Sequence, residues 1–407
     1  MTGDIDLSDL IRQGDRLVVS QGCAEPQTLC EALVAVVPET DAVETFVGPL
    51  FSKTFDGAQM RFASYGAMGG AAKLARAGRL DIWPLHYSDV VRGFETGRIR
   101  ADIVLLQLAR SPDGRLCATL SNDYAVAAAR HARVVVAEVN AQAPWCCGAE
   151  LPPDFRIDRL VETDRPLVTL ESPALAEAER AIGRYVAGLL PDGATLQLGI
   201  GALPDAILEA LASHRDLGVH SGMIADGLVP LLKAGVVTNA RKTRDRGVTV
   251  TNTAFGTRRL YDFIDANAQI RLAPAGDTHS FEAVAGQAGI VAINAALEVD
   301  LEGNVNCEFA DGQAVGGTGG LLDFTRGARA ADRGRAITVL RATDRTGSVS
   351  RIVPKVATVT VPKTDVDVVV TEFGVADLRN LGRRGRAAAL TAIAPPSVRE
   401  ALAAASR

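Results

Sequence analysis

Residues 194–227 read ATLQLGIGALPDAILEALASHRDLGVHSGMIADG, and the rest of the chain is organised around them. The apolar run at the start predicts a short strand, and Gly199 and Gly201 predict a tight turn after it. A helical apolar pattern follows, with Pro204 and Asp205 in its first turn. Both residues suit that place, because a missing N–H costs nothing there and an acid meets the positive end of the helix dipole.

A second strand is predicted over 217–220, and it ends at Ser221, Gly222 and Met223. In an open α/β sheet, the ends of such strands line the crevice in which ligands bind. Backbone N–H groups at a strand–glycine–helix junction suit an anion or an oxyanion. Two junctions this close together favour a ligand site, and two ordinary strand-to-helix turns are the alternative.

The length and composition indicate a soluble globular protein of two domains. The 407 residues exceed one ordinary core. Hydrophobic residues make up 47% and charged residues 22%, which is typical of globular proteins. The aromatic content of 5% and the 39 glycines favour α/β layers over an all-β sandwich. A net charge of −5 gives no general reason to bind nucleic acid or an anionic membrane.

The termini and cysteines predict a cytoplasmic protein without metal. The stretch Met1–Asp6 is acidic and lacks a basic region with an apolar core, so no signal peptide is expected. The sequence has no uncharged apolar stretch of about 18 residues, so no membrane span is expected. The six cysteines should be thiols in the cytoplasm. Neither their spacing nor the five scattered histidines fits a metal site.

Strands and helices are predicted to alternate along both halves of the chain. This alternation favours a doubly wound, mostly parallel α/β architecture. Near-continuous apolar runs over 103–108 and 134–139 suit strands that are buried on both faces. The pattern also predicts a helix over 7–11 and a strand over 356–360.

The chain is predicted to divide near residue 172. Residues 148–172 are rich in Pro and Asp and poor in pattern, which predicts a linker. The expected domains are therefore 1–172 and 173–407. Both halves begin with a strand, a glycine turn and a helix, which suggests an internal duplication.

A series of short strings runs through the chain in a fixed order. The strings are LQLGIGALPDA (196–206), DLGVHS (216–221), DG (226–227), GVVTN (235–239), KT (242–243), LYDF (260–263), IN (293–294), EVDL (298–301), GTGG (317–320), DF and RGA within 323–328, SRIVP (350–354) and VTEFGVADL (370–378). Looser matches in the first half are GD (14–15), DIVLLQ (102–107) and AEVN (137–140). Together they resemble the acetyl-CoA hydrolase/4-hydroxybutyrate CoA-transferase family of class I CoA-transferases, over essentially the whole chain.

The resemblance implies a fold, a substrate and a mechanism. It implies two similar open α/β domains with the active site between them, and an activity that moves coenzyme A between carboxylates. A glutamate of the family attacks the acyl-CoA to form an acyl–glutamyl anhydride. The CoA thiolate then returns to give an enzyme–glutamyl thioester, from which a second acid takes the CoA. This chemistry needs a positioned carboxylate and N–H donors for the thioester oxyanion.

The chain departs from the family at the nucleophile itself. The family string His–Ser/Thr–Glu–Met is here His220-Ser221-Gly222-Met223, so no covalent intermediate can form at residue 222. Two further departures are expected in the same pocket. They are Thr318 and Leu321 in place of Val and Gln in the glycine loop, and Ala143-Pro144-Trp145-Cys146 in place of Met-Pro-Arg-Thr.

The glycine framework remains and is expected to bind the CoA thioester and to stabilise an oxyanion or enolate. Its residues are Gly199, Gly201, Gly316, Gly317, Thr318, Gly319 and Gly320.

Four side chains near the family motifs are candidates for catalysis, each with a structural alternative. His220 suits a general base because its ordinary pKa lies near 6.5, or it is a structural histidine. Ser221 orients a ligand, or its hydroxyl bonds the turn backbone. Asp226 acts as a base, or it caps a helix over 227–234. Glu308 matches an acidic position of the family, or it is a structural carboxylate.

Cys146 and Cys147 would be nucleophiles if a neighbour lowered a thiol pKa, and buried thiols are the alternative. Trp145 walls an acyl pocket or fills a gap in the core.

Three hypotheses follow. The first is an enzyme that acts on an acyl-CoA without a glutamyl intermediate, by hydrolysis or by chemistry next to the thioester. The second is a true CoA-transferase that uses Glu308, Asp226 or direct transfer to a small carboxylate. The third is a non-catalytic acyl-CoA-binding homologue. A homodimer is expected, and Gly222→Glu is expected to create some transferase activity if only the nucleophile was lost.

Overall fold

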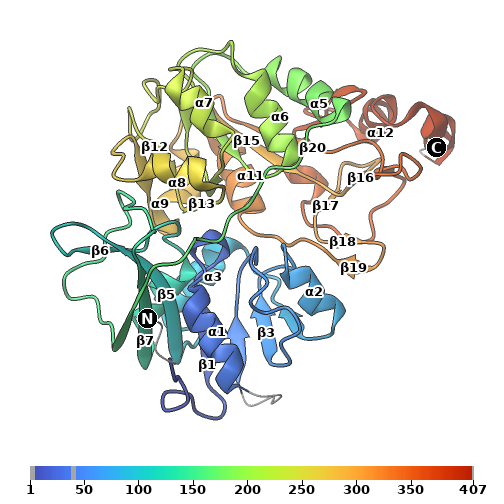
Figure 1. Cartoon of the computed structure of the whole chain (residues 1–407). Coiled ribbons are helices and arrows are strands. Elements are labelled where there is room, and N and C mark those ends of the chain that lie inside the picture. Colours follow the sequence, from blue (N-terminus) through green and yellow to red (C-terminus); the bar gives the residue numbers. More distant parts are fainter. Residues whose placement is uncertain (1–4, 38–42, 406–407) are drawn as a thin grey trace. The chain divides into compact units, whose positions relative to one another are not determined.

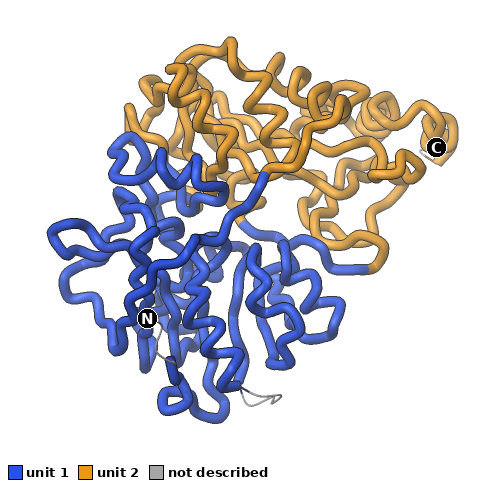
Figure 2. The backbone as a smooth tube through the Cα atoms, viewed as in Figure 1, with its two compact units in different colours: residues 1–171, 250–278, 313–319 blue, residues 172–249, 279–312, 320–407 orange. Residues whose placement is uncertain are grey.

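A computed structural model describes residues 5–37 and 43–405. The prediction of no signal peptide concerns Met1–Asp6, and the first four of these residues lie outside the described ranges. The chain forms two compact units (Figure 2). The first unit consists of residues 1–171, 250–278 and 313–319, and the second of 172–249, 279–312 and 320–407. The units are therefore not the two consecutive domains expected from the sequence, 1–172 and 173–407. The stretches 250–278 and 313–319 fold with the first unit.

The first unit is built on a parallel sheet with the strand order β4-β3-β2-β1-β5-β7-β8 (Figure 1). Short β6 pairs antiparallel with β5 at its end. The strands are β1 (Arg16–Val19), β2 (Glu44–Phe46), β3 (Arg61–Ser64), β4 (Leu80–Ile82), β5 (Ile103–Arg110), β6 (Leu116–Cys117), β7 (Val134–Asn140) and β8 (Arg159–Thr163).

Helices cover both faces of this sheet. Leu17 and Val19 of β1 pack in one apolar cluster with α1 and α2, whereas Val18 packs in another with α3 and α4. Successive side chains of a strand point to opposite faces, so this division follows from the strand itself. The helices of the unit are α1 (Gln27–Val36), α2 (Ala71–Arg76), α3 (Tyr87–Glu95), α4 (Tyr124–Ala129), α8 (Arg258–Ile264) and α9 (Ala275–Thr278).

The second unit is built on a sheet with the order β10-β9-β15-β20-β22-β23, in which only the β22–β23 pair is antiparallel. Its strands are β9 (Thr195–Leu198), β10 (Gly218–Val219), β15 (Ile290–Ala295), β20 (Arg335–Val339), β22 (Val368–Thr371) and β23 (Gly374–Asp377). Its helices are α5 (Glu177–Ala187), α6 (Ala202–Ala210), α7 (Leu228–Lys233), α10 (Phe281–Ala285), α11 (Leu321–Ala330), α12 (Arg383–Ala392) and α13 (Arg399–Ala405).

Short strands complete both units. They are β11 (Met223–Ile224), β12 (Thr249–Thr251), β13 (Thr253–Ala254), β14 (Ile270–Leu272), β16 (Glu298–Asp300), β17 (Val305–Asn306), β18 (Phe309–Ala310), β19 (Gln313–Ala314) and β21 (Ile352–Val353).

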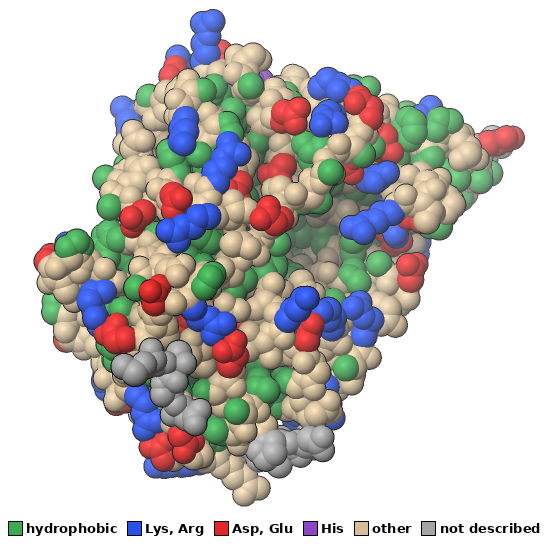
Figure 3. Space-filling model, viewed as in Figure 1, with side chains coloured by type: hydrophobic (Ala, Val, Ile, Leu, Met, Phe, Trp, Pro, Cys, Tyr) green, Lys and Arg blue, Asp and Glu red, His purple; other side chains and the backbone are tan. Residues whose placement is uncertain are grey.

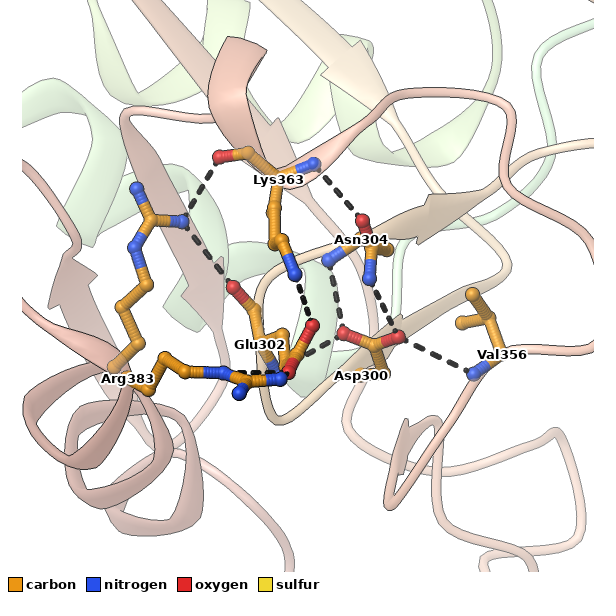
Figure 4. A network of polar contacts seen from close by, with 7 residues as sticks. Asp300, Glu302, Asn304, Val356, Lys363 and Arg383 are labelled. Atoms are coloured by element: carbon orange, nitrogen blue, oxygen red, sulfur yellow. Dashed lines mark hydrogen bonds and ion pairs between the residues drawn. The ribbon is translucent and has the colours of Figure 1, made fainter.

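The loop after β16 is held by a polar network in the second unit (Figure 4). The buried Asp300 carboxylate accepts hydrogen bonds from the Glu302 N–H at 3.0 Å and the Asn304 N–H at 2.9 Å. The Glu302 carboxylate pairs with the Lys363 ammonium and the Arg383 guanidinium. The network thereby ties the loop to the start of α12.

The predicted mostly parallel α/β architecture is confirmed, and three local predictions are wrong. The expected linker over 148–172 contains β8, an edge strand that extends the first sheet. Residues 8–10 form a turn rather than a helix. The described backbone over 356–360 forms no strand, and its last residue, Thr360, donates its N–H to the Val305 carbonyl of β17 at 2.8 Å.

One carboxylate inside the first unit caps α1 from outside the helix. The fully buried Glu138 of β7 accepts hydrogen bonds through Oε2 from the Thr28 N–H at 2.9 Å and the Leu29 N–H at 3.1 Å. Burial disfavours the ionised form and raises the pKa of Glu138 to about 7, although the Leu29 N–H and the Arg165 guanidinium oppose this.

Glu138→Gln should make the stability of the first unit less dependent on pH. The raised pKa means that the folded state keeps a proton that the unfolded state loses above its pKa of 4.5, so stability falls as pH rises from there to about 7. Relative to Glu138→Gln, the wild-type chain should lose about 3 kcal/mol over that range.

Urea unfolding followed by tryptophan fluorescence measures this effect, because Trp83 and Trp145, the two tryptophans of the chain, both lie in the first unit. A stability difference between the two proteins that stays constant from pH 4.5 to pH 8 would show that Glu138 is ionised in the folded state.

Candidate active site

The ends of β9 and β10 lie side by side and bring the two glycine junctions together. The strands pair in parallel, with Gly218 opposite Thr195 and Val219 opposite Leu196. The His220 N–H donates to the Leu196 carbonyl at 3.0 Å, so the pairing continues just past β10. The turn after β9 and the Ser–Gly step after β10 therefore leave the same edge of the sheet.

Two side chains hold the outer edge of β10, which is the first strand of its sheet. Asn239 Oδ1 accepts a hydrogen bond from the Val219 N–H at 2.8 Å. The buried Lys242 ammonium donates to the Val219 carbonyl at 2.9 Å and the Val248 carbonyl at 2.7 Å. A Cβ at Gly218 would lie 2.7 Å from Lys242 Cγ, so the lysine stem needs glycine beneath it. These side chains supply the partners that another strand would have given.

Ser221 fastens the end of β10 to β9. Its buried hydroxyl donates to the Leu198 carbonyl at 3.0 Å. The backbone of Gly222 is fixed next to this bond and is itself buried.

The space in front of Gly222 is occupied by an imidazole. A Cβ at Gly222 would lie 2.5 Å from His279 Nε2 and 2.9 Å from His279 Cε1. On another side of the ring, a Cβ at Gly320 would lie 2.7 Å from Cδ2 and 2.9 Å from Nε2. The Phe324 ring packs edge-on against His279, with 4.9 Å between ring centroids. Both glycines are therefore required by the position of this one side chain.

The His279 imidazole is held in its neutral form. Only 5% of the residue is exposed, and burial lowers the pKa of His279 to about 3, with a further contribution from the nearby His220. His220 is itself only 2% exposed. A second buried imidazole so close by further disfavours a positive charge on the His279 ring.

Asp226 directly precedes α7, whose N-cap residue is Gly227. The Asp226 carboxylate lies near Asp205, which is in the first turn of α6. Burial raises the pKa of Asp205, and the negative charge of Asp226 raises it further. Gly227 lies next to Asp226 in the chain, and a Cβ at Gly227 would be 2.6 Å from Asp205 Oδ1.

Glu308 lies between β17 and β18 and is half-buried. Its Oε1 accepts a hydrogen bond from the Thr360 hydroxyl at 2.7 Å, and its N–H donates to Asn306 Oδ1 at 3.0 Å. These contacts anchor Glu308 between β17 and the Thr360 segment.

The glycine loop 316–319 is held within the first unit. The Ala67 N–H donates to the Gly316 carbonyl at 2.8 Å, and the Tyr87 N–H to the Gly319 carbonyl at 2.9 Å. The Thr318 hydroxyl donates to the Leu85 carbonyl at 2.5 Å.

Two other glycines of the framework open helices of the second unit. Gly201, with φ of +106°, is the N-cap residue of α6, and Gly320 is the N-cap residue of α11. As glycines, both N-cap residues lack a side chain that could cap the helix. Helix N–H groups at such ends are donors for a carbonyl oxygen or an anion.

The thiols next to Trp145 are poor nucleophiles in this structure. Burial raises the pKa of the Cys146 thiol well above its usual value, and burial also raises the pKa of the half-buried Cys147. Trp145 donates its backbone N–H to Asp265 Oδ1 at 2.7 Å, and the Arg115 guanidinium lies over its ring at 5.2 Å.

His279 is not among the site residues predicted from the sequence. It lies between α9 and α10, 57 residues after Gly222, and nothing in its local sequence marks it as a site residue. Only the fold brings it against Gly222 and Gly320.

The described residues include no group of three or more His, Cys, Asp or Glu side chains arranged to hold a metal ion. None of the described helices is both long and apolar enough to cross a membrane. Basic and acidic side chains are interspersed over the face drawn in Figure 3.

Comparison with known proteins identifies the family. The acetyl-CoA hydrolase/transferase N-terminal domain matches residues 4–164, and the corresponding C-terminal domain matches residues 256–406. A 4-hydroxybutyrate coenzyme A transferase of Clostridium kluyveri is 37% identical over 401 residues, which cover 96% of this chain and 94% of the relative. The chain therefore belongs to the acetyl-CoA hydrolase/transferase family, as the resemblance predicted.

Solved structures agree with this assignment. RipA of Yersinia pestis superposes with a TM-score of 0.91 at 30% identity, over 98% of this chain and 95% of that chain. A 4-hydroxybutyrate CoA-transferase of Porphyromonas gingivalis superposes with a TM-score of 0.80 at 32% identity, over 98% and 95%.

Restoring a glutamate at position 222 should require the removal of His279, which corrects the expectation from the sequence. The first side-chain atom at position 222 would lie 2.5 Å from His279 Nε2. The backbone at Gly320, the Phe324 ring and the buried His220 lie close to the same imidazole and leave it little room to move. Gly222→Glu alone should therefore destabilise the second unit and form no glutamyl-CoA.

The double variant Gly222→Glu/His279→Gly should accept the carboxylate and form a borohydride-trappable glutamyl-CoA thioester with acetyl-CoA, detected by mass spectrometry. His279→Gly alone is the matched control and should trap nothing. Clean folding and trapping in the single Gly222→Glu variant would show instead that the imidazole moves aside freely.

Lys242→Met should destabilise the second unit by about 2 kcal/mol, because the buried Val219 carbonyl and the partly buried Val248 carbonyl lose the ammonium that satisfies them. Hydrogen–deuterium exchange of the β10 amides should quicken accordingly. Lys355→Met, at an exposed lysine of the same unit, is the control. Equal exchange in both variants would mean that Lys242 does not hold the strand.

Proposed function

We propose that this chain processes an acyl-CoA thioester without a glutamyl-CoA intermediate, by water attack on the thioester or by chemistry at the bond next to it. Family membership supports the substrate, since members of this family are CoA-transferases and acetyl-CoA hydrolases. One observation carries the rest of the proposal: a neutral imidazole, that of His279, fills the space into which a side chain at position 222 would project.

The glycine framework supports binding of the thioester. The helices α6 and α11 begin at the N-cap residues Gly201 and Gly320, which have no side chain that could cap them. Their N–H groups suit the thioester oxygen or the phosphates of CoA. The loop 316–319 keeps its backbone shape through Thr318, whose hydroxyl is bound to the Leu85 carbonyl. The N-termini of α6 and α11 can therefore serve a CoA ester without the glutamate.

Transfer through another carboxylate stays an alternative outcome of the test. Glu308 is engaged with the Thr360 hydroxyl, and Asp226 lies close to Asp205. A small carboxylate as second substrate, a homodimer and a cytoplasmic location remain predictions.

Thiol release from a panel of acyl-CoA esters, each with and without acetate, tests the proposed function. Free thiol without acetate is expected, and mass spectrometry of the same mixtures should show no new CoA ester. Acetate-dependent formation of acetyl-CoA with no free thiol would contradict hydrolysis and would establish transfer. Borohydride trapping then separates a covalent route through Glu308 or Asp226 from direct transfer. Tight binding of esters with no turnover would identify a non-catalytic homologue.

A further inference from the structure

We infer that Gln21 is a positioning residue for the glycine loop 316–319. Its side chain joins the two segments of the first unit that hold this loop. The inference rests on the proposed thioester chemistry and deepens it, because it names a residue that fixes one of the proposed binding loops.

One of the two segments follows β3. The Ala67 N–H donates to the Gly316 carbonyl at 2.8 Å. The backbones of Gly66 and Gly317 meet beside this bond, and a Cβ on Gly317 would lie 2.7 Å from the Tyr65 carbonyl oxygen. The position of this side of the loop therefore depends on Tyr65.

The other segment opens α3. The Tyr87 N–H donates to the Gly319 carbonyl at 2.9 Å. Two residues earlier, the Leu85 carbonyl accepts the hydrogen bond from the Thr318 hydroxyl. The position of this side of the loop therefore depends on Tyr87.

The Gln21 side chain connects the two tyrosines. Its Oε1 accepts a hydrogen bond from the Tyr65 hydroxyl at 2.6 Å, and its Nε2 donates to the Tyr87 hydroxyl oxygen at 3.1 Å. The two tyrosine rings also pack edge-on, with 5.4 Å between their centroids. One amide thus sets the separation of the two segments that hold the loop.

Gln21 is itself held firmly. The residue is 3% exposed, and its N–H donates to the buried Asp123 carboxylate at 2.9 Å. Its side chain lies against the bare backbone of Gly48, where a Cβ would be 2.4 Å from Gln21 Oε1. Glycine at position 48 therefore makes room for the amide.

The hydrogen bonds of this network run in one direction. The Tyr87 hydroxyl, which accepts from Gln21, donates its own proton to Asn252 Oδ1 at 2.8 Å. The Asn252 amide then donates to the Asn122 carbonyl at 2.7 Å and the Ala273 carbonyl at 2.9 Å. A Gln21 amide turned by half a turn would place its oxygen against a hydroxyl whose proton is already used. Buried networks that are satisfied in this way rigidify the groups that they join.

A rigid loop suits the proposed chemistry. Backbone donors stabilise a thioester oxygen best when they need no rearrangement as the substrate binds. Loss of the Gln21 amide should therefore loosen the loop and slow the reaction, although Gln21 itself touches neither the loop nor the substrate.

The first test is Gln21→Leu, which removes both hydrogen bonds and keeps a side chain of similar size. Hydrogen–deuterium exchange of the Ala67 and Tyr87 amides, which donate to the loop, should quicken in this variant. The value of kcat/KM for hydrolysis of acyl-CoA esters should fall by about 10²-fold, the effect expected of a misplaced binding group.

Gln107→Leu is the matched control. Gln107 is another buried glutamine of the first unit, bound to the Asn140 side chain and the Cys23 carbonyl. It should lose stability without quickening exchange at Ala67 and Tyr87, and thermal midpoints of both variants report that loss.

Tyr65→Phe is the milder variant and serves if Gln21→Leu does not fold. It removes one hydroxyl, and kcat/KM should fall by up to about tenfold, the effect of one hydrogen bond. Tyr124→Phe is its control, because the Tyr124 hydroxyl is buried in the same ring cluster but donates to the Val19 carbonyl at 2.9 Å. In the Gln21→Leu background, Tyr65→Phe should have no further effect, because the bond that it removes is already lost.

Four results would overturn the inference while the proposed function stands. They are unchanged exchange in Gln21→Leu, equal losses in a variant and its control, additive effects of Gln21→Leu and Tyr65→Phe, and faster exchange with unchanged kcat/KM. A wild-type chain that turns over no ester would instead remove the proposed function and the role of Gln21 in it. Exchange, which needs no substrate, would then still decide whether Gln21 positions the loop.

Discussion

The contact between the His279 imidazole and the bare backbone of Gly222 is the constraint that sets the packing at the end of β10. Gly222 has no side chain to fill the space in front of it. The His279 ring fills that space, requires glycine at position 320 as well, and packs on Phe324. Because protein interiors are close-packed, a substitution of one of these residues alone would destabilise the fold. The space beside Gly222 is therefore packed rather than empty.

The strand next to this contact depends on unusual partners. β10 is short and lies at the edge of its sheet, and edge strands leave backbone groups without a neighbour. The Asn239 amide and the buried Lys242 ammonium satisfy Val219 on that side. The strings GVVTN and KT, which helped to identify the family, thus have a structural reason. They hold the strand that carries His220 and Gly222.

Much of the fold could be predicted from the sequence, because it depends on local pattern. The apolar runs of β5 and β7 and the glycine turn before α6 were all expected where they occur. The edge strand β8 was missed because its alternating pattern lies among prolines and aspartates. His279 was missed for a different reason. Its role depends on two glycines that are distant in the chain, and a glycine leaves no side-chain pattern by which its neighbour could be recognised.

The first unit has a consequence for the order in which the chain can fold. Its sheet is made within the first 171 residues, yet α8 and α9 come from 250–278 and a further strip from 313–319. During synthesis the N-terminal sheet emerges long before these pieces, and the start of the second unit is made in between. The first unit therefore cannot complete its fold until residue 319 has been synthesised and has left the ribosome. No single cut in the chain separates the residues of one unit from those of the other.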